Sequence, residues 1–136
     1  MAEKILFDLE KDQTNQQTAR FFLGKLFEKK QHYPKSIKWY RAVNDGMHHV
    51  SAQLQAAELL SVLMLQHKEA LVVLKNIQSN TLSDQKKIVL SSVYILKRDN
   101  RPELAMETVN YFLKVLPGDL DLLYARAMIA LSLIHI

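Results

Sequence analysis

Two histidines and two aspartates are the residues best suited to chemistry, and neither pair has the spacing of a known site. His48 and His49 are adjacent, so on a helix they would point about 100° apart, and no His or Glu four residues on supports either as a metal ligand. Asp119 and Asp121 flank a predicted helix start, where carboxylates stabilise the N-terminal dipole. We interpret the histidines as loop residues and the aspartates as helix-start residues, and we predict no catalytic residue.

Sequence signatures of nucleotide binding and of hydrolysis are also missing. The three glycines are isolated, so they cannot form a phosphate-binding loop, and the sequence contains neither HExxH nor GxSxG. The lack of cysteine excludes a disulfide framework and a thiolate metal site. We therefore expect that the protein is not an enzyme, holds no metal and uses no cofactor.

A basic stretch from Arg20 to Arg41 is the strongest charge feature in a chain of net charge +4. It holds seven basic residues and one acid, Glu28. One interpretation is a solvated face on two helices, and another is a patch for an acidic partner. Because aromatic residues, among them Phe21, Phe22, Tyr33 and Trp39, lie near the basic ones, binding of single-stranded nucleic acid by charge and stacking is the alternative function. Most of these aromatics also have core roles in the repeat pattern. Trp39 is interpreted as packed between helical hairpins rather than as a ligand platform.

Composition predicts an all-α protein with one domain, 1–136. Hydrophobic residues make up 49% of the 136 residues, and Gly and Pro together number only six. No apolar run approaches the ~18 residues of a membrane span. Residues 1–11 carry five charges, which is atypical of a signal peptide. We expect a soluble protein as written, which is cytoplasmic or, if a native signal was removed, periplasmic or envelope-associated.

Small residues recur at fixed intervals in two series. In one series the steps are 34 and 35 residues, and large apolar residues follow at i+1, i+4 and i+7, as on one helix face: Ser36, Ala70 and Ala105. In the other series the steps are 33, 35 and 35: Gly24, Ala57, Ser92 and Ala127. Two helices per unit of about 34 residues predict about eight helices in three to four hairpins, each with a first and a second helix. Such hairpins stack into a right-handed αα-superhelix.

The chain resembles the tetratricopeptide repeat (TPR) family over nearly its whole length. Four residues match the signature of the first helix: Ala19, Leu23, Gly24 and Phe27. Ser36 and Tyr40 match the second helix, and Pro117 follows Ala105 by twelve residues, where the family often has a proline. Residues 38–41 with 44–46 are also similar to Sel-like repeats. The first hairpin and residues 121–130 look like repeat proteins of bacteria, some of them envelope lipoproteins.

The resemblance implies a scaffold or adaptor that binds a peptide or helix of a partner protein in a concave groove lined by first helices. The groove residues that it implies are Phe21, Lys25, Lys29, Leu54, Glu58, Val62, Val93, Lys97, Tyr124 and Met128. The groove would be basic at its N-terminal end and apolar in the middle, which suits a partner with acidic residues. Nothing in the residues identifies that partner.

Several helix boundaries are predicted from capping residues. Thr14 with Gln17 and Asn100 with Glu103 fit cap pairs, and Ser83 and Asp119 are expected to cap helices. Gly46 is expected to end the helix that begins near Pro34 in a left-handed conformation.

The two ends of the sequence resemble incomplete hairpins. Residues 2–11 look like a second helix without its first, and the last helix, 119–133, looks like a first helix without its second. We therefore expect a fragment of a longer repeat array, with 132–136 as an uncharged scar. The uncovered residues would allow self-association through 119–134: Leu123, Ala127, Ala130, Leu131 and Ile134.

Overall fold

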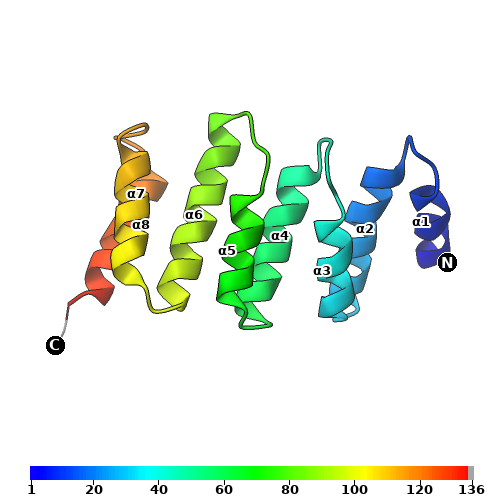
Figure 1. The fold of residues 1–136 in the computed structure, drawn as a ribbon, viewed down its shortest axis with the longest axis horizontal. Coiled ribbons are helices and arrows are strands. Elements are labelled where there is room, and N and C mark those ends of the chain that lie inside the picture. Colours follow the sequence, from blue (N-terminus) through cyan, green and yellow to red (C-terminus); the bar gives the residue numbers. More distant parts are fainter. Residues whose placement is uncertain (135–136) are drawn as a thin grey trace. The chain divides into compact units, whose positions relative to one another are not determined.

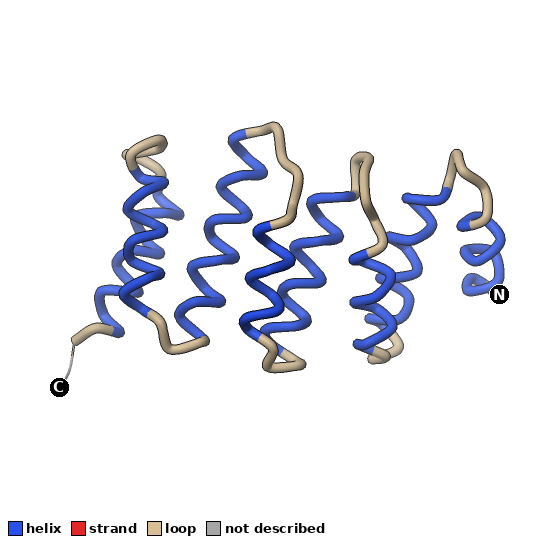
Figure 2. Tube along the Cα trace, in the orientation of Figure 1, coloured by secondary structure: helices blue, strands red, loops and turns tan. Residues whose placement is uncertain are grey.

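The computed structural model describes residues 1–134, which form eight helices and no strand (Figures 1 and 2). The last two residues of the tail 132–136 lie outside the described residues. The chain divides into two compact units, 1–78 and 79 onward, each treated by itself below. The predicted all-α class is confirmed, and the helices pack in sequential hairpins consistent with a helical repeat array. A superhelical handedness stays a prediction.

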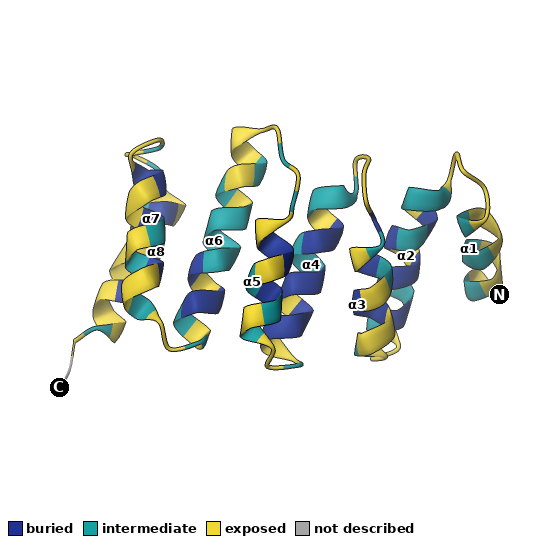
Figure 3. Ribbon diagram, in the orientation of Figure 1, coloured by how far each residue is buried: buried dark blue, intermediate teal, exposed yellow. Residues whose placement is uncertain are grey.

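The first unit contains five helices, each packed against the next along the chain. Their bounds are α1 Ala2–Glu10, α2 Gln16–Lys29, α3 Tyr33–Arg41, α4 His49–Val62 and α5 His67–Lys75. The hairpins are α2–α3 and α4–α5, and the first helices α2 and α4 also touch each other. Buried residues concentrate on α2 to α5, whereas α1 has none (Figure 3).

The second unit contains three helices. They are α6 Leu82–Arg98, α7 Pro102–Leu113 and α8 Leu120–Ser132. The α6–α7 pair forms the hairpin, and α8 packs on both. Leu122, Ala125 and Ile129 are the buried residues of α8 and bind it to these two neighbours.

One turn geometry closes all three hairpins. Gln31, Leu65 and Asn100 have φ values of 63°, 55° and 58°, in the left-handed region that L-residues rarely adopt. The residue after each donates its N–H to a carbonyl oxygen near the end of the first helix, at 2.8 Å, 2.8 Å and 2.9 Å. These turns lie 34 residues (31 to 65) and 35 residues (65 to 100) apart. The structure thus contains the same period as the small residues.

The α2–α3 hairpin closes tightly over its small residues. Ser36 is fully buried, and its Oγ donates a 2.7 Å hydrogen bond to the Gly24 carbonyl oxygen. A Cβ on Gly24 would lie 2.5–2.9 Å from atoms of the Tyr40 ring, so only glycine leaves room for that ring. Gly24 and Ala57, which belong to the second series of small residues, are both buried.

The loop between α3 and α4 is held by side chains from both first helices. The buried Gln53 amide donates to the carbonyl oxygens of Tyr40 at 3.0 Å, Arg41 at 3.3 Å and Val43 at 3.0 Å. Arg20 donates to the Ala42 carbonyl oxygen at 2.9 Å. These bonds satisfy carbonyl groups at a helix end, which have no partner within the helix. The predicted stop at Gly46 is wrong, because α3 already ends at Arg41, although Gly46 is left-handed in the loop.

The predicted capping pair of Thr14 and Gln17 is also wrong. The N-cap of α2 is Asn15, and no side chain caps this helix. Gln17 instead accepts a 2.7 Å hydrogen bond from the Asn44 backbone N–H in the α3–α4 loop. A contact 27 residues away has therefore replaced the local one.

The structure confirms one of the three helix caps predicted for the second unit. Asp119 caps α8 as predicted, accepting from the Leu122 N–H at 3.1 Å. The cap of α6 is Thr81 rather than Ser83, because its Oγ1 accepts from the Asp84 N–H at 3.1 Å. The pair of Asn100 and Glu103 does not cap α7, since Asn100 is the left-handed turn residue described above.

Candidate interaction surface

Most residues expected to line a partner groove are accessible on first helices. The exposed ones are Lys25, Lys29, Glu58, Val62 and Tyr124, and the partly exposed ones are Leu54, Lys97 and Met128. Five of these eight belong to α2 and α4 of the first unit, where the two helices are in contact. We call these five the first-helix face: Lys25, Lys29, Leu54, Glu58 and Val62. The other three belong to the second unit.

Phe21 and Val93 are corrections to the expected groove, because they are only 7% and 0% exposed. The Phe21 ring stacks on the His48 ring at 4.3 Å with an interplanar angle of 8°, and it also meets the Tyr40 ring at 6.0 Å. Phe22 is the exposed aromatic instead, at 42%. One residue along a helix rotates a side chain by about 100°, so a small error in the assumed face exchanges a core residue for a surface one.

A polar network fixes α2, α3 and α4 beneath this face. Glu28 accepts a 2.6 Å hydrogen bond from the Tyr40 hydroxyl and a 2.9 Å bond from the Gln55 amide. Burial raises the pKa of Tyr40, and its hydrogen bond to Glu28 raises that pKa further, so the hydroxyl stays a donor. The only acid of the basic stretch therefore has a structural role, and the two first helices are linked through it.

Three members of the basic stretch make polar contacts within the protein. Arg20 binds the α3–α4 loop, Lys30 pairs with Glu3 at 2.9 Å, and Arg41 pairs with Glu69 at 2.9 Å. The two ion pairs are partly exposed and contribute little to stability. Lys25 lies over the Phe21 ring at 4.9 Å, a cation–π contact that leaves its ammonium accessible. The accessible positive charge is thus smaller than the sequence suggests.

An apolar groove of about 410 Å³ runs between α1 and α2. Its lining comes from both helices: Ala2, Ile5, Leu6, Phe22, Lys25, Leu26 and Lys29. On another side of α1, Phe7 contacts the Trp39 ring edge-on at 5.6 Å. Trp39 therefore packs between neighbouring helical elements, as predicted. A second groove, of about 490 Å³, lies between α6 and α7 and includes Leu104 and Tyr111.

Both histidines considered as metal ligands contribute to packing and loop structure. His48 stacks on Phe21. His49 Nδ1 lies 2.7 Å from the Val43 carbonyl oxygen, and its Nε2 accepts from the Gln78 N–H at 3.2 Å. This arrangement requires the tautomer that is protonated at Nδ1. His49 thereby joins the α3–α4 loop to the end of the first unit.

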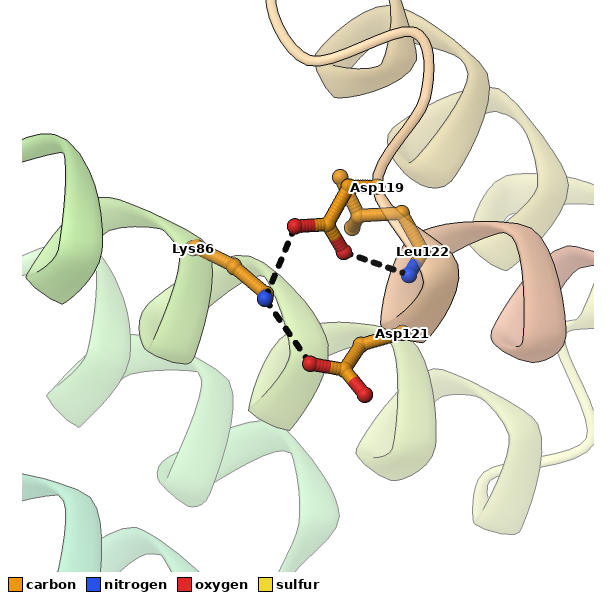
Figure 4. Close-up of polar contacts among 4 residues, drawn as sticks. All are labelled: Lys86, Asp119, Asp121 and Leu122. Carbon is orange, nitrogen blue, oxygen red and sulfur yellow. Dashed lines mark hydrogen bonds and ion pairs between the residues drawn. The ribbon is translucent and has the colours of Figure 1, made fainter.

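The two aspartates near α8 bind a lysine rather than forming an acid–base pair. The Lys86 ammonium lies 2.8 Å from a carboxylate oxygen of Asp119 and 2.8 Å from one of Asp121 (Figure 4). Hydrogen bonding from Lys86 lowers the pKa of Asp119, and the Leu122 N–H adds to that shift. The same contacts, first with Asp119 and then with Asp121, raise the pKa of Lys86. The site links α8 to α6 through the two ion pairs of Lys86.

Within residues 1–134, no helix is long and apolar enough to cross a membrane. No cluster of three or more His, Cys, Asp or Glu in the same residues could hold a metal ion. No family model matches the sequence, and no curated protein matches it. The candidate interaction surface is therefore defined by its own residues and their packing.

Proposed function

We propose that this chain is a tetratricopeptide-like repeat array that holds a partner protein on the first-helix face. Two features support this kind of repeat. The left-handed turns share the period of the small residues, and Ser36, Ala70 and Ala105 are all fully buried. In stacked helical hairpins each helix buries one side against its neighbours, so the other side of the first helices can offer a surface.

The observation that carries the functional proposal is the chemistry of the first-helix face. Lys25 and Lys29 place two ammonium groups on α2, and Val62 is 42% exposed at the end of α4 beside the exposed Leu63. A partner helix with acidic residues at one end and apolar residues at the other would match this order. The Glu28 network holds the two helices in place before binding, which lowers the entropic cost of association.

Nucleic-acid binding is the less supported alternative. Arg20, Lys30 and Arg41 already make polar contacts inside the protein. Phe21 is buried and the half-buried Trp39 packs against Phe7, so these two rings are less accessible for base stacking than the sequence alone suggests.

The test uses amphipathic helical peptides selected on the purified chain from a displayed library. Peptides that bind should carry acidic residues next to an apolar stripe. The double variant Lys25→Glu, Lys29→Glu should weaken their binding by about tenfold or more, measured by fluorescence anisotropy. Lys35→Glu, Lys38→Glu is the matched control, because it reverses two exposed charges on the second helix α3.

A salt series separates the two functions. Binding of single-stranded polyuridylate should fall steeply with salt if the protein recognises phosphates, whereas an apolar helix should remain bound. Equal loss of peptide binding in the α2 and α3 double variants would contradict the proposed face. Tight polyuridylate binding at physiological salt would favour the alternative.

A further inference from the structure

We propose that the α1–α2 groove receives helix α8 of a second copy of this chain, so that copies join head to tail. The groove and the uncovered face of α8 are the two halves of a hairpin of the kind that the protein already builds between α2 and α3.

The α1 side of the groove has the register of a second helix. Ala2 and Leu6 lie 34 residues before Ser36 and Tyr40 (2 to 36, 6 to 40). In the α2–α3 hairpin, Ser36 and Tyr40 are the residues that touch Gly24 of the first helix. Ala2 and Leu6 line the groove. The groove is therefore open at the positions where a first helix would pack.

The uncovered face of α8 has the register of a first helix. Ala127 lies 35 residues after Ser92 and 70 after Ala57 (57 to 92 to 127), and Ala57 is fully buried. Ala127 and Ala130 are exposed, and Leu131 is 60% exposed. The opposite face of α8 is already used, since Leu122, Ala125 and Ile129 are buried within the second unit.

The two surfaces are complementary in size and in charge. Gly24 receives the large Tyr40 ring, so the slightly larger Ala127 suits the smaller Leu6 side chain. The uncovered face of α8 has no charged residue: Leu123, Ala127, Ala130, Leu131 and Ile134. Lys25 and Lys29 lie at the α2 side of the groove, where their stems can cover apolar surface with their ammonium groups in water. An uncharged helix face therefore fits this groove.

The contact joins two different surfaces, which decides the form of the assembly. Each copy keeps a free groove at one end and a free α8 at the other after the first contact. Such heterologous contacts produce rings or open chains rather than a closed symmetric dimer. This proposal does not depend on the proposed partner function, because its test contains only the purified chain.

The test pairs two variants that block opposite ends. Ile5→Arg places a charge in the groove and should abolish self-association through the head, with Phe22→Arg as an independent second variant. Ala127→Arg should abolish self-association through the tail. Val72→Arg is the control, because Val72 is 48% exposed on α5, outside both the α1–α2 groove and α8. Circular dichroism establishes that each variant is folded, and light scattering after size exclusion measures mass over a wide concentration range.

The expected result is specific to head-to-tail pairing. The mass of the parent chain and of Val72→Arg should rise with concentration beyond that of a dimer, whereas each blocked variant alone should keep the mass of a single chain, about 15.7 kDa. An equimolar mixture of Ile5→Arg and Ala127→Arg should form a 1:1 heterodimer and nothing larger. A monomeric parent, self-association of Ile5→Arg alone, or a mixture that stays monomeric would each overturn the proposal. Loss of association in Val72→Arg would also overturn it, since any added charge would then suffice.

Discussion

Helices α2 and α8 are both first helices by register, yet their equivalent small residues differ in burial. Gly24 of α2 is buried under the Tyr40 ring, whereas Ala127 of α8 is exposed. Helix α2 packs on a second helix within its own hairpin, while the described residues place no second helix over Ala127. The repeat pattern thus specifies which side of a helix can be buried, and the neighbouring helix decides whether it is.

The two helices are also held by different forces. Tight apolar packing and a buried polar network fix α2, through Tyr40 and Glu28. Helix α8 combines one apolar face with charge contacts of Lys86 at its N-terminus. Substitutions at equivalent positions should therefore have unequal consequences.

The largest difference is expected for the two tyrosines. Tyr40→Ala removes a buried ring and leaves a cavity, so it should lower the free energy of unfolding by ~3–5 kcal/mol. Tyr124→Ala, at a 63% exposed position of α8, should change it by less than ~0.5 kcal/mol. Urea unfolding followed by circular dichroism measures both variants, because the signal comes from the helices of both units. Similar losses in both variants would mean that Tyr124 is covered in solution.

A smaller difference is expected for two alanines in the same repeat position. Ala57→Leu overpacks a fully buried contact and should cost ~1–3 kcal/mol. In Ala127→Leu the added side chain is exposed to solvent, so the free energy of unfolding should change by less than ~0.5 kcal/mol. Thermal unfolding of dilute samples by circular dichroism compares the two. Dilution matters, because Ala127 belongs to the proposed contact between copies.

A third substitution should stabilise the α4–α5 hairpin. Leu65 is left-handed and 73% exposed, so its side chain makes few contacts that would offset the unfavourable backbone. Glycine adopts this left-handed conformation without steric strain, although it loses more backbone entropy on folding. The net effect of Leu65→Gly should be a free energy of unfolding that is higher by ~0.5–1 kcal/mol. The same assay detects it as a higher melting temperature. Leu63→Gly is the control, because Leu63 has φ −98° and should lose stability.

The smallest effect is expected from the charge contacts of α8 and depends on pH. The pKa of Asp119 is lowered in the folded state, so its stabilisation is present above the ordinary aspartate pKa of about 3.9 and is lost as pH falls through the folded value. Lys86→Gln should therefore flatten the fall of melting temperature between roughly pH 5 and pH 2. Lys87→Gln, at the exposed neighbouring lysine, should retain the parent profile. Identical profiles for the two variants would show that the Lys86 contacts do not stabilise the fold.

The sequence predicts the repeat well because the residues behind it are local. Small residues at steps near 34, with large ones at i+4 and i+7, describe one helix against its neighbour, and Ser36 and Tyr40 lie where that pattern requires. Asp119 is predicted as a cap because its N–H partner is three residues away. Both kinds of signal depend only on short distances along the chain.

Features that depend on distant residues were not predictable. Gln53 is an ordinary polar residue in a helix, and nothing nearby indicates that its amide binds the end of α3. Gln17 fits a local cap but bonds to Asn44 instead. Phe21 and Phe22 differ by one position, and only Phe21 is buried, where its ring meets those of Tyr40 and His48. The left-handed turns also lack a glycine signal, since Gln31 and Leu65 occupy two of them.

The contrast between the turns and the α3–α4 loop has a consequence for how such a chain can vary in length. Turns within hairpins are closed by backbone bonds across one left-handed residue, so an inserted residue there would break the register of both helices. Residues 45–47 of the α3–α4 loop are exposed, while the carbonyl groups before them are held by Gln53 and Arg20. Insertions at 45–47 should leave both hairpins intact, because the longer loop adds only a small closure entropy. Length variation is thus tolerated between hairpins and excluded within them, which would let such an array acquire new surface loops on a constant helical frame.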